Sequence, residues 1–333
     1  MIPDYIFAAT IVAYGELFQG QWWHPIWRTP ILGKYNLSDP IVVSKLIDHA
    51  TGYGSIDCFF IDTPWWDIHD EVVKMISNPL FSDNGIRFAI LYNSIGTRSL
   101  KKIDGWKTDF DDPENVKGLI RDFQALARLF FTRDNYLRVG GRPVVYLYAS
   151  DGYVGSVKDA IDSLRRSLKD NFKLSVYLFS GVMERSHPLH PLHTTSSREL
   201  RRLAEPYDGV TVWGGGFSGQ PRFLGNSYED QLENLYSLWS EMLKGEGKGF
   251  MPSFKNGENT TLLPWGSPVT LPRSPELFSR RFDILKKYTR NYPYFKILRV
   301  DTLDDWYEDT AIAWSKEEGP VYFEIMRQKI SEF

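Results

Sequence analysis

Cysteine is nearly absent from this chain of 333 residues, in which Cys58 is the only one. A single thiol excludes a framework of internal disulfides. Because Cys58 lies within the apolar run 56–61, we expect it to be buried as a small hydrophobic residue rather than to react. Long hydrophobic runs are also missing, since none reaches the roughly 18 apolar residues that a membrane-spanning helix needs. The sequence therefore favours neither a disulfide-stabilised protein nor one that spans a membrane.

Positive charge is not in excess either. The chain carries 39 Lys and Arg against 42 Asp and Glu, for a formal net charge of -3. Proteins that bind nucleic acid or an anionic membrane surface concentrate positive charge, so we expect neither partner. The apolar stretch 6–12 follows Asp4 and no Lys or Arg, which favours a strand over a signal peptide. The compartment stays open, with the cytoplasm slightly favoured.

Short apolar runs rich in β-branched and aromatic residues recur along the chain, and helical patterns lie between them. The expected strands are residues 5–13, 56–61, 87–92, 143–148, 174–179, 209–212, 249–254 and 296–300. The expected helices are residues 40–53, 114–131, 156–168, 227–243, 275–288 and 320–330. Strand and helix therefore alternate, and eight strands are expected.

This alternation predicts an α/β protein with a parallel sheet, because continuous apolar strands separated by helices are buried on both faces. Eight such units favour a closed (β/α)₈ TIM barrel, and a doubly wound open sheet is the main alternative. No low-complexity linker divides the chain, so we expect one barrel domain over residues 1–333. Functional groups in a barrel lie on the loops after the strands, and these loops are long here.

Aromatic and polar residues gather in those loops. Aromatic residues make up 15% of the chain, with 11 Trp and 18 Tyr, more than a core usually requires. Such side chains can line a groove for a sugar, although any single Trp could equally plug the barrel mouth. The candidate binding residues are Trp22, Trp23, Trp65, Trp66, Asp62, Tyr92, Asn93, Trp213, Asn256, Trp306 and Tyr307.

The segment after the eighth expected strand is rich in acids. Asp305 and Glu308 lie three residues apart beside Trp306 and Tyr307, so a turn would place both carboxyl groups on one side. Two cooperating carboxyl groups are what glycosidic bond cleavage requires, one to protonate the leaving oxygen and one as base or nucleophile. A solvated acidic loop or an acidic helix start explains the same residues equally well.

Several segments resemble a known family in the same order along the chain. They are residues 29–40, residues 56–62 with Trp65-Trp66, residues 135–146, residues 251–254, and Asp304-Asp305-Trp306-Tyr307-Glu308-Asp309-Thr310. The last is similar to the signature Asn-Glu-Trp-His-Glu-Gly-Thr. Together they resemble the endo-α-mannosidase-like enzymes, glycoside hydrolase family 99 and its relatives.

The resemblance implies a glycosidase acting on α-mannosidic or related glycans. It implies that Asp305 assists the sugar 2-hydroxyl and that Glu308 acts as general acid/base. Three of the departures from the family bear on the expected chemistry. Asp305 is one methylene shorter than glutamate, Tyr307 replaces histidine, and Asn93 stands where an acid is common after the third strand. Because of these departures, the alternative that the barrel binds glycans without cleaving them stays open.

Two other motifs carry less weight. His187, His190 and His193 could meet one metal ion, but the intervening prolines prevent a helix that would place them on one face. The run Gly214-Gly215-Gly216 could cradle phosphate, but no Lys-Ser/Thr follows it, so a flexible turn is favoured. We therefore expect no metal and no other cofactor, and a carbohydrate as the partner.

Overall fold

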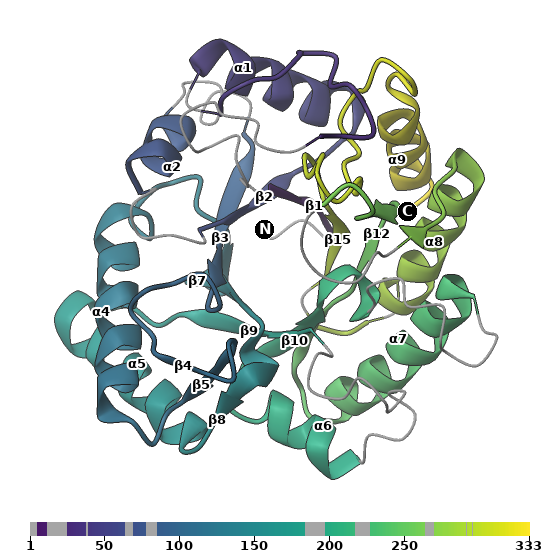
Figure 1. The fold of residues 1–333 in the computed structure, drawn as a ribbon. Coiled ribbons are helices and arrows are strands. Elements are labelled where there is room, and N and C mark those ends of the chain that lie inside the picture. Colours follow the sequence, from purple (N-terminus) through teal and green to yellow (C-terminus); the bar gives the residue numbers. More distant parts are fainter. Residues whose placement is uncertain are drawn as a thin grey trace.

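The computed structural model describes residues 5–11, 25–37, 39–63, 69–77, 85–183, 197–216, 227–263, 270–290, 292–294 and 296–333. Its central feature is a ring of parallel strands around one axis (Figure 1). In chain order they are β1 (Ile6–Ile11), β2 (Cys58–Asp62), β3 (Arg87–Asn93), β7 (Arg142–Tyr148), β9 (Tyr177–Val182), β10 (Gly209–Val212), β11 (Gly249–Met251), β12 (Ser253–Lys255) and β15 (Ile297–Asp301).

The ring closes through a broken seventh strand. Strand β11 pairs with β10 and β12 pairs with β15, and Pro252 separates the two halves. Proline has no N–H to give to a ladder, so the strand is interrupted there. The carbonyl of Pro252 still accepts from the N–H of Arg299 at 3.1 Å, which keeps β15 in place. Strand β15 then pairs with β1, which closes the barrel.

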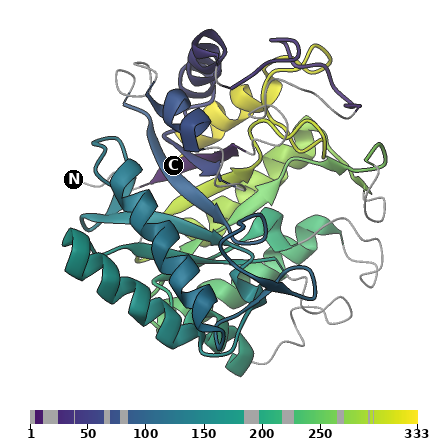
Figure 2. The same cartoon turned by 60° about the vertical axis from the view of Figure 1, so that its left-hand side comes forward.

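Helices cover the outside of the barrel. They are α1 (Pro40–Asp48), which continues into a π-helical turn (His49–Tyr53), α2 (His69–Ile76), α4 (Pro113–Leu129), α5 (Val157–Phe172), α6 (Ser197–Ala204), α7 (Tyr228–Gly245), α8 (Pro275–Thr289) and α9 (Val321–Ser331). Figure 2 shows α4 and α5, in teal, packed side by side against the sheet.

Local sequence fixes where several helices begin. Asp39 accepts from the N–H of Ile41, and Asp112 accepts from the N–H of Glu114, each just before a proline in the first turn. Ser227 and Asp230 form a capping box at the start of α7. None of the described helices is long and apolar enough to cross a membrane.

Short strands complete the structure. The segments β4 (Lys102–Ile103), β5 (Lys107–Asp109) and β8 (Tyr153–Val154) form a small sheet of their own. Strand β6 (Arg138–Val139) pairs with β7, and β13 (Glu258–Asn259) pairs with β14 (Thr270–Leu271). Two 3₁₀ turns, Ser150–Gly152 and Trp213–Gly216, follow β7 and β10.

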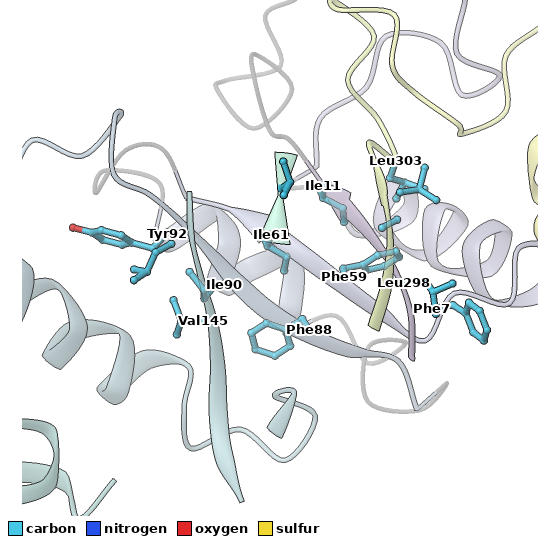
Figure 3. Packing of buried hydrophobic residues seen from close by; sticks show 14 of the residues in the cluster. Phe7, Ile11, Phe59, Ile61, Phe88, Ile90, Tyr92, Val145, Leu298 and Leu303 are labelled. Atoms are coloured by element: carbon cyan, nitrogen blue, oxygen red, sulfur yellow. The ribbon is translucent and has the colours of Figure 1, made fainter. Parts of the chain in front are cut away.

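The period of two along each strand divides the apolar residues between two cores. Phe7, Phe59 and Phe88 point outward and pack under the helices (Figure 3). The alternate residues, such as Cys58 and Phe60, fill the barrel interior. Side chains of a strand point alternately to its two faces, so the parity of a position decides whether it reaches the interior.

All eight expected strands and all six expected helices are confirmed, with the seventh strand in two parts. The closed ring excludes the open doubly wound sheet. Cys58 is fully buried, as expected, and burial raises the pKa of its thiol. Helices α2 and α6 and the short strands were not predicted. Both helices have only eight residues, too few for a periodic apolar pattern to stand out.

Candidate active site

The loop after β15 is closed by its own hydrogen bonds. The hydroxyls of Thr302 and Thr310 lie 2.8 Å apart, and the N–H of Asp305 donates to Thr302 Oγ1 at 2.9 Å. The N–H groups of Thr310 and Ala311 both donate to the carbonyl of Asp305, at 3.1 and 3.2 Å. The loop therefore returns on itself, and Asp305 and Glu308 are held on one rigid turn at the carboxyl end of the barrel.

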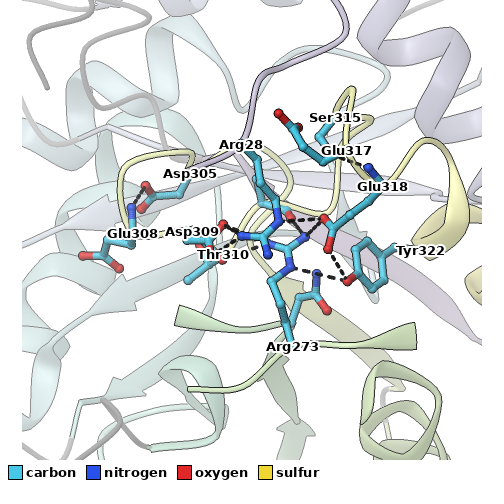
Figure 4. A network of polar contacts seen from close by, with 12 residues as sticks. Arg28, Arg273, Asp305, Glu308, Asp309, Thr310, Ser315, Glu317, Glu318 and Tyr322 are labelled. Atoms are coloured by element: carbon cyan, nitrogen blue, oxygen red, sulfur yellow. Dashed lines mark hydrogen bonds and ion pairs between the residues drawn. The ribbon is translucent and has the colours of Figure 1, made fainter. Parts of the chain in front are cut away.

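The carboxyl group of Asp305 lies in an acidic and nearly dry environment. Asp305 is 3% exposed, and its Oδ1 accepts from the N–H of Glu308 at 3.0 Å (Figure 4). Burial, together with the charges of Glu308 and Asp304, raises the pKa of Asp305 well above its usual value. The raised pKa favours the protonated form of Asp305. The Glu308 side chain, by contrast, keeps 32% of its surface exposed.

A buried lysine faces this pair from β12. Lys255 Nζ lies 2.8 Å from Glu258 Oε2 and 4.0 Å from Glu308 Oε2, and the Lys255 and Glu258 side chains are each 4% exposed. Burial lowers the pKa of Lys255, but the carboxylates of Glu258 and Glu308 raise it by more. The cation is therefore shared, with its close contact to Glu258 and a longer one to Glu308.

Gly214 makes room for this lysine. Its backbone has φ +51°, and a Cβ at this position would lie 2.6 Å from Cγ of Lys255. Its N–H donates to Asp301 Oδ2 at 2.9 Å. Only glycine accepts both this conformation and this close approach. The glycine run after β10, which we interpreted as a flexible turn, thus packs the stem of Lys255.

A second acidic position lies at the end of β2, which only β1 separates from β15. Asp62 Oδ2 accepts from the amide of Asn93 at 3.3 Å. Burial raises the pKa of Asp62 to about 8, the hydrogen bond from Asn93 lowers it, and the charge of Asp304 raises it. Asp62 thus also holds a proton at neutral pH, and the predicted residues Asp62 and Asn93 do lie together.

A buried network forms the floor beneath these groups. Asp301 accepts from Thr10 Oγ1 and Ser253 Oγ at 2.7 Å each and from Arg299 Nη2 at 3.0 Å. The Arg299 guanidinium lies over the Tyr146 ring at 4.3 Å. These contacts join β1, β12 and β15 inside the barrel, so the strand ends that carry the site are held in fixed positions.

Two predicted binding residues point elsewhere. The Tyr92 hydroxyl donates to Asp122 on α4 at 2.7 Å, and its ring faces the helices (Figure 3). Tyr92 has the same parity as the outward-facing Phe88, so the neighbour Asn93 faces the interior instead. Trp306 is 2% exposed, and its indole N–H donates to the Tyr35 hydroxyl at 2.8 Å. Both rings therefore pack between barrel and helices rather than at the mouth.

The remaining predicted residues differ in how far they are available. Trp213 is half-buried above the barrel interior and meets Tyr148 edge to face at 5.0 Å. The amide oxygen and nitrogen of Asn256 are buried and have no partner among the described residues. Tyr307 is 5% exposed. Trp22, Trp23, Trp65 and Trp66, like the histidines 187, 190 and 193, lie outside the described residues.

Sequence reasoning missed Lys255, Glu258, Arg299 and Asp301. Lys255 and Asp301 are the last residues of β12 and β15, and their parity directs them into the barrel. A charged residue at an inward position on a strand end was a usable signal. Within the described residues, no group of His, Cys, Asp and Glu is placed to hold a metal ion.

The whole fold was compared with known proteins. No family model and no curated protein matches the chain. A solved structure of a glycoside hydrolase-like protein matches with a TM-score of 0.78 at 18% identity, covering 98% of this chain and 94% of the other. The GH99 endo-alpha-mannosidase from Bacteroides thetaiotaomicron matches with a TM-score of 0.69 at 14% identity, covering 98% and 97%.

A GH113 beta-1,4-mannanase matches less closely, with a TM-score of 0.53 at 9% identity over 89% of this chain and 94% of the other. The fold is shared with family 99 glycoside hydrolases. The likeness in fold that residues 29–40 and 304–310 led us to expect is therefore confirmed.

Proposed function

We propose that this protein is a glycoside hydrolase that acts on α-mannosidic or related glycans. The observation that carries the proposal is the pair Asp305 and Glu308, held on one rigid turn at the carboxyl end of the barrel, with a raised pKa at Asp305. The likeness in fold to glycoside hydrolases, among them endo-alpha-mannosidases, supports the reaction class. The signature-like segment 304–310 supports the mannosidic substrate.

In this proposal Glu308 protonates the leaving oxygen, because its side chain is the one that reaches solvent. Asp305 is the partner carboxyl group. Its raised pKa favours the protonated form in the free protein, so in this proposal the proton passes from Asp305 to Glu308, and the Asp305 carboxylate then assists as a base. The Lys255 ammonium, 4.0 Å from Glu308, steadies the charge left on Glu308 after the proton has moved.

Binding of the sugar is assigned to the groups that remain available at the mouth. Trp213 offers part of a ring face, and Asn256 offers an amide without a partner among the described residues. Asp62 and Asn93 offer a protonated carboxyl and an amide for hydroxyl groups. Trp22, Trp23, Trp65 and Trp66 are kept as binding residues on their sequence positions alone.

The test is release of reducing sugar from a panel of α-mannosidic and other glycans. We expect Glu308→Gln and Asp305→Asn each to lower the rate roughly a hundredfold to ten-thousandfold without unfolding the protein. Glu324→Gln is the matched control, since Glu324 is exposed on α9, and it should retain full activity. Turnover by Glu308→Gln equal to that of the unmodified protein would remove Glu308 from the mechanism.

Glycan binding without cleavage is the second candidate. It is favoured by the near-complete burial of the Asp305 carboxyl and by the lysine within 4.0 Å of Glu308. Binding needs ring stacking and hydrogen bonds but no proton transfer. The same panel separates the two functions, because a binder would retain glycans on Glu308→Gln and on the unmodified protein alike, with no sugar released from either.

A further inference from the structure

A hollow of about 220 Å³ lies beside the Asp305–Glu308 turn and belongs to none of the groups assigned above. Three segments form its walls, and they are locked together. The N–H of Ile31 donates to the carbonyl of Trp314 at 2.8 Å, and the N–H of Lys316 donates to that of Thr29 at 2.8 Å. The lining residues are Trp27, Arg28, Asn259, Asp309, Glu317 and Glu318.

The hollow shares a backbone wall with Glu308. The N–H of Asn259 donates to the carbonyl of Glu308 at 2.7 Å, and Asp309 is the next residue along the chain. A group bound here therefore lies close to the backbone of the residue whose side chain is the proposed proton donor. In the proposed function Glu308 protonates the oxygen of the leaving group. Sugars bound on the Glu308 side of the glycosidic bond therefore belong to the leaving group.

Paired charges make the walls rigid. Arg28 binds both carboxylate oxygens of Asp309, and its Nε lies 3.0 Å from Glu318 (Figure 4). Behind the wall, Arg273 lies 3.2 Å from Asp309 and 2.6 Å from Glu318. The guanidinium of Arg273 also lies over the Tyr322 ring at 5.0 Å. Two arginines thus neutralise two carboxylates.

Glu317 is the carboxylate left over. Its Oε2 accepts from the N–H of Thr29 at 3.0 Å, and it has no cationic partner among the described residues. Its weak burial raises the pKa of Glu317, but hydrogen bonds, including that from Thr29, lower it by more, so it is charged at neutral pH. With Arg28 and Arg273 against three carboxylates, the hollow carries a net charge of about -1 and should repel anions.

Trp27 supplies an aromatic face. It is 43% exposed, and it is one of the residues that line the hollow. An exposed aromatic ring beside carboxylates and an amide is suited to a sugar ring, which stacks its C–H face and directs its hydroxyls to polar groups.

We propose that this hollow binds a sugar ring on the leaving-group side of the Glu308 position and selects uncharged or amino sugars over uronic acids. The binding claim stands on the hollow itself, whereas the leaving-group side rests on the proposed function.

Binding is tested with three probes: methyl α-mannoside, glucosamine and glucuronate. The reporter is the indole N–H NMR signal of Trp27, assigned from Trp27→Phe. We expect saturable shifts with the first two probes and at least about fivefold weaker binding of glucuronate. Glu317→Gln should reduce the difference in affinity between glucosamine and glucuronate. Tyr294→Ala should leave the affinities of all three probes unchanged. Tyr294 is the matched control, since it is 42% exposed and precedes β15 at the opposite end of the barrel. No shift at Trp27, or glucuronate binding as tightly as glucosamine, would overturn the proposal.

Whether the hollow binds the leaving-group sugar is tested with two substrates that have the same non-reducing part and different leaving groups. Trp27→Ala should raise KM about tenfold on an oligosaccharide and leave KM unchanged on an aryl glycoside, which has no leaving sugar. An equal rise on both substrates would refute the leaving-group placement. If the probes bind but no glycan is cleaved, the proposed function fails and the sugar site stands. If glycans are cleaved but no probe reaches Trp27, the sugar site fails alone.

Discussion

Replacing Lys255 by Met should reveal how much the acidic mouth depends on one buried cation. Lys255 and Glu258 lie 2.8 Å apart with 4% of each side chain exposed. Methionine keeps the apolar stem against Gly214 but removes the charge. Taking one partner from a buried pair leaves the other without compensation and typically costs about 3–5 kcal/mol. We therefore expect a loss of that size in urea unfolding at pH 8.

The loss of stability caused by Lys255→Met should be larger at high pH than at low pH. Without Lys255, burial raises the pKa of Glu258 further above its unfolded value of about 4.3. Below that value Glu258 is protonated in both states, so it costs nothing, and the cost grows as the pH rises above it. The loss should therefore shrink by at least half at pH 4.5. Adding Glu258→Gln to Lys255→Met should recover about 2–3 kcal/mol at pH 8.

An exposed pair of the same geometry is the control. Lys117 and Glu114 also lie 2.8 Å apart and three residues apart, but their side chains are 71% and 57% exposed. Lys117→Met should leave the free energy of unfolding nearly unchanged, because water screens such pairs. Two results would contradict this reasoning: Lys255→Met lowering the free energy of unfolding no more than Lys117→Met does, or lowering it equally at pH 4.5 and pH 8. Either would show that burial of the Lys255–Glu258 pair does not determine its contribution to stability.

Two further variants test the surrounding groups. Asp309→Gly should lower the free energy of unfolding in urea by about 1–3 kcal/mol, because Arg28 and Arg273 lose a carboxylate partner. Glycine suits the φ of 59° at this position, which acts in the opposite direction. A gain in stability would show that relief of backbone strain outweighs the lost ion pairs. Because the pKa of Asp62 is raised in the folded state, its ionisation should lower the free energy of unfolding as the pH rises from about 4 to about 8. Asp62→Asn removes this titration, so the free energy of unfolding should fall less steeply over that range. An unchanged slope would show that another group causes the pH dependence.

The barrel could be predicted because its strands are apolar on both faces and its helices carry local start signals. Each of these signals lies within a short stretch of sequence, as Ser274 and Pro275 illustrate at the start of α8. Helix α6 lacked such a signal, since among its eight residues charged side chains outnumber apolar ones. Its position is set by packing against the barrel, which one short segment does not encode.

The candidate site was predictable only in part. The adjacency of Asp305 and Glu308 follows from their spacing on a turn. The direction of Tyr92 could have been read from strand parity, because Phe88, Ile90 and Tyr92 alternate with Ala89 and Leu91. The burial of Trp306 could not, because it depends on Tyr35, which is 271 residues away. The same holds for Arg28 and Asp309, 281 residues apart.

The balance of charge at the mouth connects the proposed chemistry with the proposed selectivity. Lys255 lies 2.8 Å from Glu258 and 4.0 Å from Glu308, and Asp305 adds a third carboxyl group nearby. One ammonium does not compensate three buried or half-buried carboxylates, and burial raises the pKa of both Asp305 and Glu258. In the proposed mechanism Glu308 is the group that delivers to the leaving oxygen the proton kept within this set of carboxyl groups. The same excess of carboxyl groups disfavours an anionic ligand, which is the selectivity inferred independently for the hollow beside Glu308.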